Sequence, residues 1–194
     1  MNKSYFSLFG ILSFLMAILV CISNFLVQYP VNFFGLNEIL TYGAFSYPIT
    51  FFITDLANRS YGIKIARKIV YIGFFLGIIL TLFFSTNFED LISIRIAIGS
   101  GTAFIFAQLL DVKIFDNLRN RAWYVAPLTS SFLGSSVDTI LFFFISFYKT
   151  DVPWLTLAIG DFLVKILIAL VMLIPFRLLL NKIKDESKIY LKTI

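Results

Sequence analysis

The sequence contains no histidine and only one cysteine, Cys21. Histidine is the commonest general base at neutral pH and the commonest protein ligand of zinc and copper, so its absence argues against most metal sites and most intramembrane enzymes. One cysteine can form neither an internal disulfide nor a thiolate metal site, and Cys21 is interpreted as a small buried hydrophobe. We therefore expect no catalytic residues, no metal and no cofactor.

Charge is also scarce: 14% of the residues are charged, whereas soluble domains carry about a quarter. Hydrophobic residues make up 59% of the 194, so lipid is the expected solvent. At about 20 residues per span, the chain has room for about six helices. The predicted fold class is an all-α polytopic membrane protein, a single compact bundle over residues 1–194. The net charge of +5 is attributed to the cytoplasmic side of that bundle and not to nucleic-acid binding.

Six apolar runs are long enough to cross a bilayer. They are residues 6–27, 39–57, 65–84, 91–110, 124–148 and 154–180. The first run is too long for a signal peptide and is followed by no small-residue cleavage site, so it is expected to be a retained helix. Pro48 lies inside the second run and predicts a kink, because proline leaves one backbone carbonyl without its helical donor.

Lysine and arginine fall in alternate loops, and only Lys149 lies in a loop on the opposite side. The residues on the basic side are Lys3, Arg59, Lys64, Arg67, Lys68, Lys113, Arg119, Arg121, Arg177, Lys182, Lys184, Lys188 and Lys192. Basic residues resist translocation, so the pattern predicts an inner-membrane protein with both termini in the cytoplasm. The tail, residues 181–194, is interpreted as a frayed helix end that rests on anionic headgroups.

Asp138 is the clearest ionisable residue at membrane depth. Such residues are costly in hydrocarbon and normally face a partner or a cavity. Ser131, Ser135 and Asp138 are spaced by four and three residues, which places them on one helix face, and Thr139 is adjacent. The pattern favours a ligand site. The alternative is that these small polar residues only allow helices to pack closely.

Two further pairs of charges lie inside predicted helices. Asp161 and Lys165 are four residues apart, in the order that favours an ion pair, which could be structural or functional. Asp55 follows Thr54 and precedes Arg59 by four residues. It is interpreted as part of a site or gate, with an interfacial ion pair as the alternative.

The fourth predicted helix contains Arg95 near one end and Gln108 near the other. Arg95 could pair with Glu89 or Asp90. Trp123, at the membrane edge, either belongs to an interfacial aromatic belt or stacks on a flat heteroaromatic ligand. The edge of such a ligand would be bound by amide or carboxylate groups, which Gln108 and Asp138 can supply.

Three polar motifs occur in order along the chain. They read YPITFFITDLANRSYG from Tyr47, AFIFAQLLDVKIFDNLR from Ala103 and SSVDTILFFFISFY from Ser135. Together they resemble the queuosine precursor transporter family, also described as vitamin-uptake-like. Its members share the patterns P-x-T-F-x-x-T-D, A-Q-x-x-D-V-x-I-F-x-x-L-R and S-x-x-D-T-x-x-F. The resemblance implies a six-helix importer of 7-deazaguanine precursors, such as 7-cyano- or 7-aminomethyl-7-deazaguanine or queuine, for modification of the tRNA wobble base.

The resemblance and the polar residues point to the same parts of the chain. Our hypothesis is that Asp55, Gln108 and Asp138 converge on a midplane cavity that binds a deazapurine by its edge, with aromatic side chains over its faces. The candidate substrate-binding residues are Asp55, Gln108, Asp138, Thr139, Thr54, Ser135 and Trp123. Residues with a gating or structural polar role are Arg59, Arg95, Asp111, Arg119, Asp161 and Lys165.

Three interpretations of the chain remain open. The first is an importer that works alone. The second is a substrate-binding subunit of an energy-coupled vitamin importer with a separate ATPase module; it predicts a docking surface of small residues, for which Ala97, Gly99, Gly101 and Ala103 are candidates. The third is a membrane enzyme or scaffold. No GxxxxGK[ST] loop exists, so energy must come from a gradient, a partner ATPase or trapping of the substrate. A homo-oligomer also stays open.

Overall fold

The described part of the computed structural model, residues 3–84 and 86–180, is a bundle of helices without a β-strand ladder. The predicted all-α class is confirmed. The elements are α1 (Lys3–Leu26), the short 3-10 helix η1 (Leu36–Glu38), α2 (Gly43–Ser46), α3 (Ile49–Tyr61), α4 (Ile63–Phe84), α5 (Leu91–Leu118), α6 (Val125–Phe147) and α7 (Trp154–Leu180).

Five of these helices, α1, α4, α5, α6 and α7, are long and apolar enough to cross a membrane. Their outward side chains are large and apolar: Phe83 is 81% exposed and Leu178 is 67% exposed. Such surfaces are unfavourable in water and favourable in lipid. The described residues therefore form a multi-pass membrane protein.

The second predicted span, residues 39–57, is wrong as one continuous helix. The chain forms the short helix α2, breaks at Tyr47 and Pro48, and continues as the 13-residue helix α3. Proline has no backbone N–H, so the α-helical bond from residue 48 to the Ala44 carbonyl cannot form. The predicted kink at Pro48 is therefore present as a break in the helix, and α2 and α3 together take the place of a sixth span.

The helix α5 is longer than predicted, because it runs to Leu118 and not to residue 110. It therefore includes Asp111, which lies just past the end of the predicted run, and Gln108 lies well inside it. The Asp90 carboxylate caps its first turn by accepting hydrogen bonds from the backbone N–H groups of Ile92 at 3.0 Å and Ser93 at 3.2 Å. The other long helices agree with the predicted runs to within about three residues.

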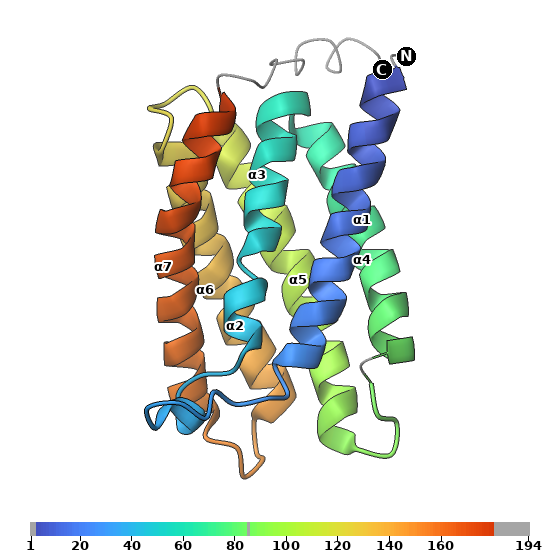
Figure 1. The fold of residues 1–194 in the computed structure, drawn as a ribbon, viewed down its shortest axis with the longest axis vertical. Coiled ribbons are helices and arrows are strands. Elements are labelled where there is room, and N and C mark those ends of the chain that lie inside the picture. Colours follow the sequence, from blue (N-terminus) through green and yellow to red (C-terminus); the bar gives the residue numbers. More distant parts are fainter. Residues whose placement is uncertain (1–2, 85, 181–194) are drawn as a thin grey trace.

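In Figure 1 the start of α1 and the end of α7 lie at the same end of the bundle. The helix α1 packs on α4, α5 packs closely on α6, α7 lies beside α6, and the α2–α3 segment contacts α1, α5 and α7. Small residues allow the close α5–α6 approach: a Cβ at Gly99 would overlap the Ser146 side chain. The predicted tail, residues 181–194, lies outside the described residues.

Candidate functional site

Three buried charges form one cluster between α6 and α7. The Lys165 ammonium lies 2.5 Å from Asp161 Oδ2 and 2.6 Å from Asp138 Oδ2. The Thr139 hydroxyl donates to Asp161 Oδ2 at 2.8 Å and accepts from Lys165 at 3.1 Å. The predicted ion pair of Asp161 and Lys165 is confirmed. The partnership of Lys165 with Asp138 was not predicted, because it joins two helices.

Lys165 is 2% exposed and Asp138 is also 2% exposed. Burying charges at this depth is costly unless they are paired and hydrogen-bonded. With both carboxylates ionised, one ammonium leaves the cluster a formal charge of −1. The cluster is therefore suited to a neutral or cationic solute and disfavours an anion.

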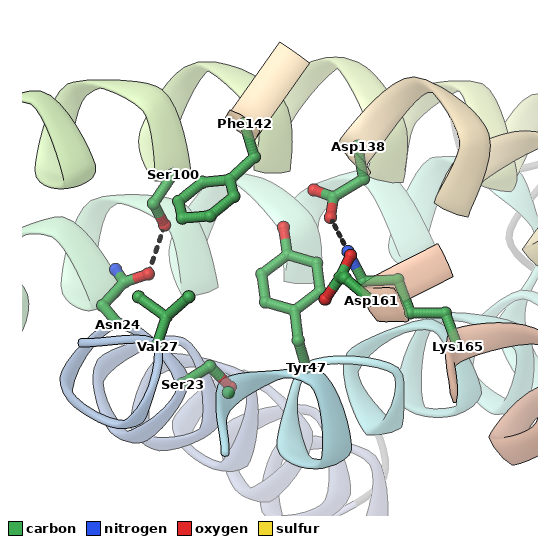
Figure 2. A pocket seen from close by; sticks show the side chains of 10 residues that line it. Ser23, Asn24, Val27, Tyr47, Ser100, Asp138, Phe142, Asp161 and Lys165 are labelled. Carbon is green, nitrogen blue, oxygen red and sulfur yellow. Dashed lines mark hydrogen bonds and ion pairs between the residues drawn. The ribbon is translucent and has the colours of Figure 1, made fainter. Parts of the chain in front are cut away.

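A small cavity lies against this cluster, and Figure 2 shows the side chains around it. Its volume is about 20 Å³, close to what one water molecule needs, whereas ligand pockets have volumes of several hundred Å³. A bicyclic solute can bind here only if the walls move apart. The lining residues are Ser23, Asn24, Val27, Gly43, Tyr47, Ser100, Asp138, Phe142, Asp161 and Lys165.

The Tyr47 hydroxyl lies beside the Asp138 carboxylate and interacts with it. Neither this hydroxyl nor Asp138 Oδ1 makes a hydrogen bond of ordinary geometry with a described residue. In Figure 2 the Tyr47 hydroxyl points into the space between Phe142 and Asp138. The Tyr47 ring also lies 5.1 Å from the Lys165 ammonium. Buried polar groups are almost always paired. A donor and an acceptor that face each other without a well-formed hydrogen bond therefore mark a place where a polar ligand can bind between them.

The opposite wall is polar as well. The Ser100 hydroxyl donates to Asn24 Oδ1 at 2.5 Å, and Asn24 Nδ2 donates to the Thr81 hydroxyl at 2.9 Å. These bonds tie α1 to α4 and α5 at the level of the cavity. They also fix the orientation of the Asn24 amide beside the space that a ligand would occupy.

Gln108 does not line this cavity. Its amide nitrogen donates to the Thr50 hydroxyl at 2.8 Å, and its oxygen accepts from the Thr54 hydroxyl at 2.5 Å. The Thr50 hydroxyl in turn donates to the carbonyl of Tyr47 at 2.7 Å. Gln108 and Thr54 therefore hold α3 against α5 next to the cavity.

Asp55 lies in a separate buried site with Asp111. Ser130 Oγ donates to Asp55 Oδ1 at 3.2 Å, and Asp55 lines a second small cavity between α3, α6 and α7. We predicted that Asp55, Gln108 and Asp138 meet in one cavity, and the structure does not bring them together. Asp55 contacts α6 at Ser130, about two helical turns before Asp138. Ser135, buried on α6 between Ser130 and Asp138, lines neither cavity.

The arginine residues bind backbone carbonyls. Arg59 donates to the carbonyl of Arg119 at 2.9 Å, and Arg119 donates to the carbonyl of Arg59 at 3.2 Å. The alternative Asp55–Arg59 pair is not formed. Arg95 donates to the carbonyls of Ile145 and Tyr148, at 2.9 and 2.8 Å, and so caps the end of α6. The alternative pairing of Arg95 with Glu89 or Asp90 is not formed.

Trp123 lies away from the cavity. Its ring is 37% exposed and has the Arg177 guanidinium 5.0 Å from its centroid. The aromatic residues at the cavity are Tyr47 and Phe142, which we did not single out. Asn24 and Ser100 were also missed. Asn24 carried a usable signal, since it is an amide within an otherwise apolar run.

The stripe of small residues on α5 is used inside the chain. A Cβ at Gly99 would meet Ser146 and Phe142 of α6, a Cβ at Gly101 would meet Ile78 of α4, and Ala103 is fully buried. Neighbouring helices therefore cover Gly99 and Ala103, whereas Ala97 and Gly101 line an open groove between α1, α4 and α5.

The fold and this site define the class of protein: a multi-pass membrane protein with a buried polar centre. A family model described as "Putative vitamin uptake transporter" matches residues 41–180. No solved structure matches the chain.

The curated relatives give the family a narrower name. The "Queuosine precursor transporter" of Escherichia coli K12 is 33% identical, over 97% of this chain and 95% of that protein. The "Probable queuosine precursor transporter" of Haemophilus influenzae is 34% identical, over 84% of this chain and 82% of that protein. A protein of the same name from Bacillus subtilis is 30% identical, over 89% of this chain and 92% of that protein. The chain belongs to the queuosine precursor transporter family, which confirms the resemblance.

Proposed function

We propose that this chain imports a queuosine precursor, a 7-deazaguanine, across the inner membrane, with both its termini in the cytoplasm. The substrate binds at the cavity beside Tyr47, Asp138 and Lys165. The observation that carries this assignment is that the Tyr47 hydroxyl and Asp138 Oδ1 are buried side by side at the cavity without a hydrogen bond of ordinary geometry. Membership of the family supports the class of substrate.

The chemistry of the pair matches one edge of a deazaguanine. That edge presents a carbonyl oxygen, which accepts a hydrogen bond, next to a ring N–H, which donates one. The Tyr47 hydroxyl can donate to the carbonyl while Asp138 Oδ1 accepts from the N–H. Phe142 can cover a face of the ring, and Asn24 offers an amide on the opposite wall.

Lys165 and Asp161 set the charge of this site. Lys165 holds Asp138 Oδ2 at 2.6 Å, which leaves Oδ1 directed to the ligand. The formal charge of −1 on the cluster accepts a neutral cyano-substituted precursor and also the cationic aminomethyl form. An anionic nucleotide is disfavoured, so the free base is the transported form.

The wall that opens is the α2–α3 segment. The break at Tyr47 and Pro48 lies at the cavity. Because Pro48 donates no helical hydrogen bond, the chain can bend there without breaking one. Transporters commonly bind substrate at discontinuous helices near the middle of the bilayer. Movement of α2 relative to α3 would enlarge the cavity enough to admit a bicyclic solute.

Orientation follows the basic residues, which are concentrated at the end of the bundle where α1 begins and α7 ends. With Cys21 replaced by serine, a cysteine introduced at Lys149 should react with a membrane-impermeant reagent in intact cells, and one at Arg121 should not. Reaction at Arg121 alone would reverse the orientation.

Binding to the purified protein tests the site. We expect Tyr47→Phe and Asp138→Asn to weaken binding of the preferred precursor by about tenfold or more, because each removes a hydrogen bond to a buried group worth about 1.5 kcal/mol or more. Calorimetric titration measures the affinity. Tyr124→Phe and Asp116→Asn, the same substitutions away from the cavity, are the matched controls. Unchanged affinity in both cavity variants would contradict the assignment.

A further inference from the structure

A second buried polar site lies between α3, α5 and α6, around Asp55 and Asp111. Asp55 is 2% exposed and Asp111 is fully buried. The two carboxylates are close enough to repel each other, and the hydroxyl of Ser130 lies beside both. That hydroxyl donates to Asp55 Oδ1 at 3.2 Å. Two buried acids from different helices thus lie beside one hydroxyl at membrane depth.

Neither oxygen of Asp111 makes a hydrogen bond of ordinary geometry with a described residue, because the Ser130 hydroxyl beside it donates to Asp55 and to the carbonyl of Pro127. Oδ1 of Asn58 also lacks a donor among the described residues. Asn58 is fully buried, and its amide nitrogen donates to the carbonyl of Val112, the residue after Asp111. Asp111 itself is directed at α6, since its Cβ lies 3.3 Å from the position of a Cβ at Gly134. The site therefore has several acceptor atoms and too few donors.

The basic side chains on the surrounding elements are engaged elsewhere. On α3 and α5, Arg59 and Arg119 donate to each other's carbonyls. On α7, Lys165 binds Asp138 and Asp161, and the Arg177 guanidinium lies over the Trp123 ring.

The remaining charged groups of α4 and α5 are paired or at least partly exposed: Arg95 binds carbonyls at the end of α6, and Lys113 is exposed. Asp116 of α5 pairs with Arg119 at 3.3 Å, and Lys64, Arg67 and Lys68 lie in the first turns of α4, at partly or fully exposed positions. Within the described residues, no salt bridge neutralises Asp55 or Asp111.

From this geometry we infer that Asp55 and Asp111 hold one exchangeable proton between them and that this proton moves inward with the substrate. The inference rests on the proposed import function. Two carboxylates that share a dry site are stabilised when one proton lies between them, since the proton removes one charge and supplies the missing donor. A proton also fits the second cavity beside Asp55, which is only about 10 Å³.

The two sites are linked through hydrogen-bonded side chains that lie between them. Gln108 lies one helical turn before Asp111 on α5. Its amide forms hydrogen bonds with Thr50 and Thr54 of α3, which lie between Tyr47 and Asp55 in the sequence. A movement of α3 at the substrate cavity has to shift these hydrogen bonds, and it would then change the position of Asp55 relative to Asp111.

The step balances simply. One carboxylate binds a proton from the outside while the substrate is bound, and the carboxyl releases it to the cytoplasm after the substrate leaves. No covalent bond of the substrate changes. A neutral precursor thus enters with one positive charge, so both a pH gradient and an inside-negative potential drive its accumulation.

Infrared spectroscopy tests the proton without relying on transport. We expect the purified protein at neutral pH to show the C=O stretch of a buried protonated carboxyl, sensitive to exchange in D₂O, which Asp111→Asn and Asp55→Asn each abolish or shift. Asp116→Asn, the same change on α5 outside the site, leaves it unaltered. A neutral-pH spectrum without such a band, or a band that neither variant changes, would overturn the inference.

Proteoliposomes test the coupling. An inward gradient of about one pH unit should give about tenfold accumulation of a deazaguanine precursor at one proton per solute. Asp111→Asn should abolish this accumulation but keep exchange of labelled for unlabelled precursor across the membrane. Accumulation that is independent of the pH gradient, or that requires sodium at fixed pH, would refute proton coupling. Absence of exchange in the unaltered protein would instead refute the import function, so the two failures are distinguishable.

Discussion

At the scale of single residues, the decisive feature is that a few buried side chains have the wrong number of partners. Lys165 binds two carboxylates, whereas Asp138 Oδ1 and the Tyr47 hydroxyl lie beside each other without a hydrogen bond of ordinary geometry to any described residue. The ion pairs of Lys165 hold the two carboxylates in place, and the Tyr47 hydroxyl and Asp138 Oδ1 remain able to bind a ligand. Fold and function therefore depend on the same cluster in different ways.

Lys165→Met tests the structural half of this statement. The substitution leaves Asp138 and Asp161 buried without their cation, which should destabilise the protein by about 3–5 kcal/mol. We expect a lower thermal unfolding temperature in detergent and lower abundance in the membrane. The triple variant Lys165→Met, Asp138→Asn, Asp161→Asn should recover most of the loss. Lys149→Met, an exposed control, should change neither quantity, and equal stability of Lys165→Met would show that the cluster is not structural.

Sequence periodicity predicted some of these residues and not others, for a physical reason. Asp161 and Lys165 are neighbours on one helix, so their spacing alone predicted the pair. The contact of Lys165 with Asp138 and the position of Tyr47 depend on which faces of different helices meet. That arrangement is decided by packing, and no local pattern encodes it.

At the scale of the elements, the α2–α3 segment and the chain before it, residues 27–42, differ most from an ordinary span. Thr156 of α7 donates to the carbonyl of Glu38 at 2.9 Å, and Gly160 faces the carbonyl of Ile39 so closely that a Cβ there would overlap it. This segment therefore rests on α7 just beyond the level of the cavity. Its seat on α7 sets the position of α2.

Gly160→Ala tests that seating. The added methyl group should push the Ile39 backbone away from α7 and destabilise the protein by about 1–3 kcal/mol, as overpacking typically does. Thermal unfolding measures the loss, and we expect substrate uptake to fall with it because α2 carries one wall of the cavity. Gly10→Ala is the control, since a Cβ there meets nothing within 4 Å. A Gly160→Ala protein as stable as that control would mean that the segment moves freely on α7.

Hydropathy predicted the five long helices well, because their length and apolar character are local properties. It failed where local and tertiary effects compete. Pro48 divides the second run into α2 and α3, and α5 continues two turns past its apolar part because Asp111 and Val112 are buried against other helices. A charged residue at the end of an apolar run can thus belong to the helix interior.

At the scale of the whole molecule, two buried polar sites stand at different depths of one helical bundle. One is a proposed solute site next to a broken helix, and the other is an acidic site without a basic partner among the described residues. Thr50, Thr54 and Gln108 connect them by hydrogen bonds, an arrangement that suits a transporter. The surface that faces outward is apolar over α7, where only a few residues are buried. Lipid is sufficient to cover it.

The central claim, import of a queuosine precursor, is tested most directly in a bacterium that can neither synthesise 7-deazaguanine precursors nor import them. The chain is expressed there, each precursor is supplied outside at nanomolar concentration, and queuosine in tRNA is quantified. We predict that at least one precursor restores queuosine with the unaltered chain, and that Asp138→Asn at equal membrane abundance restores much less. Failure of every precursor to restore queuosine, with the unaltered protein demonstrably in the membrane, would contradict the account.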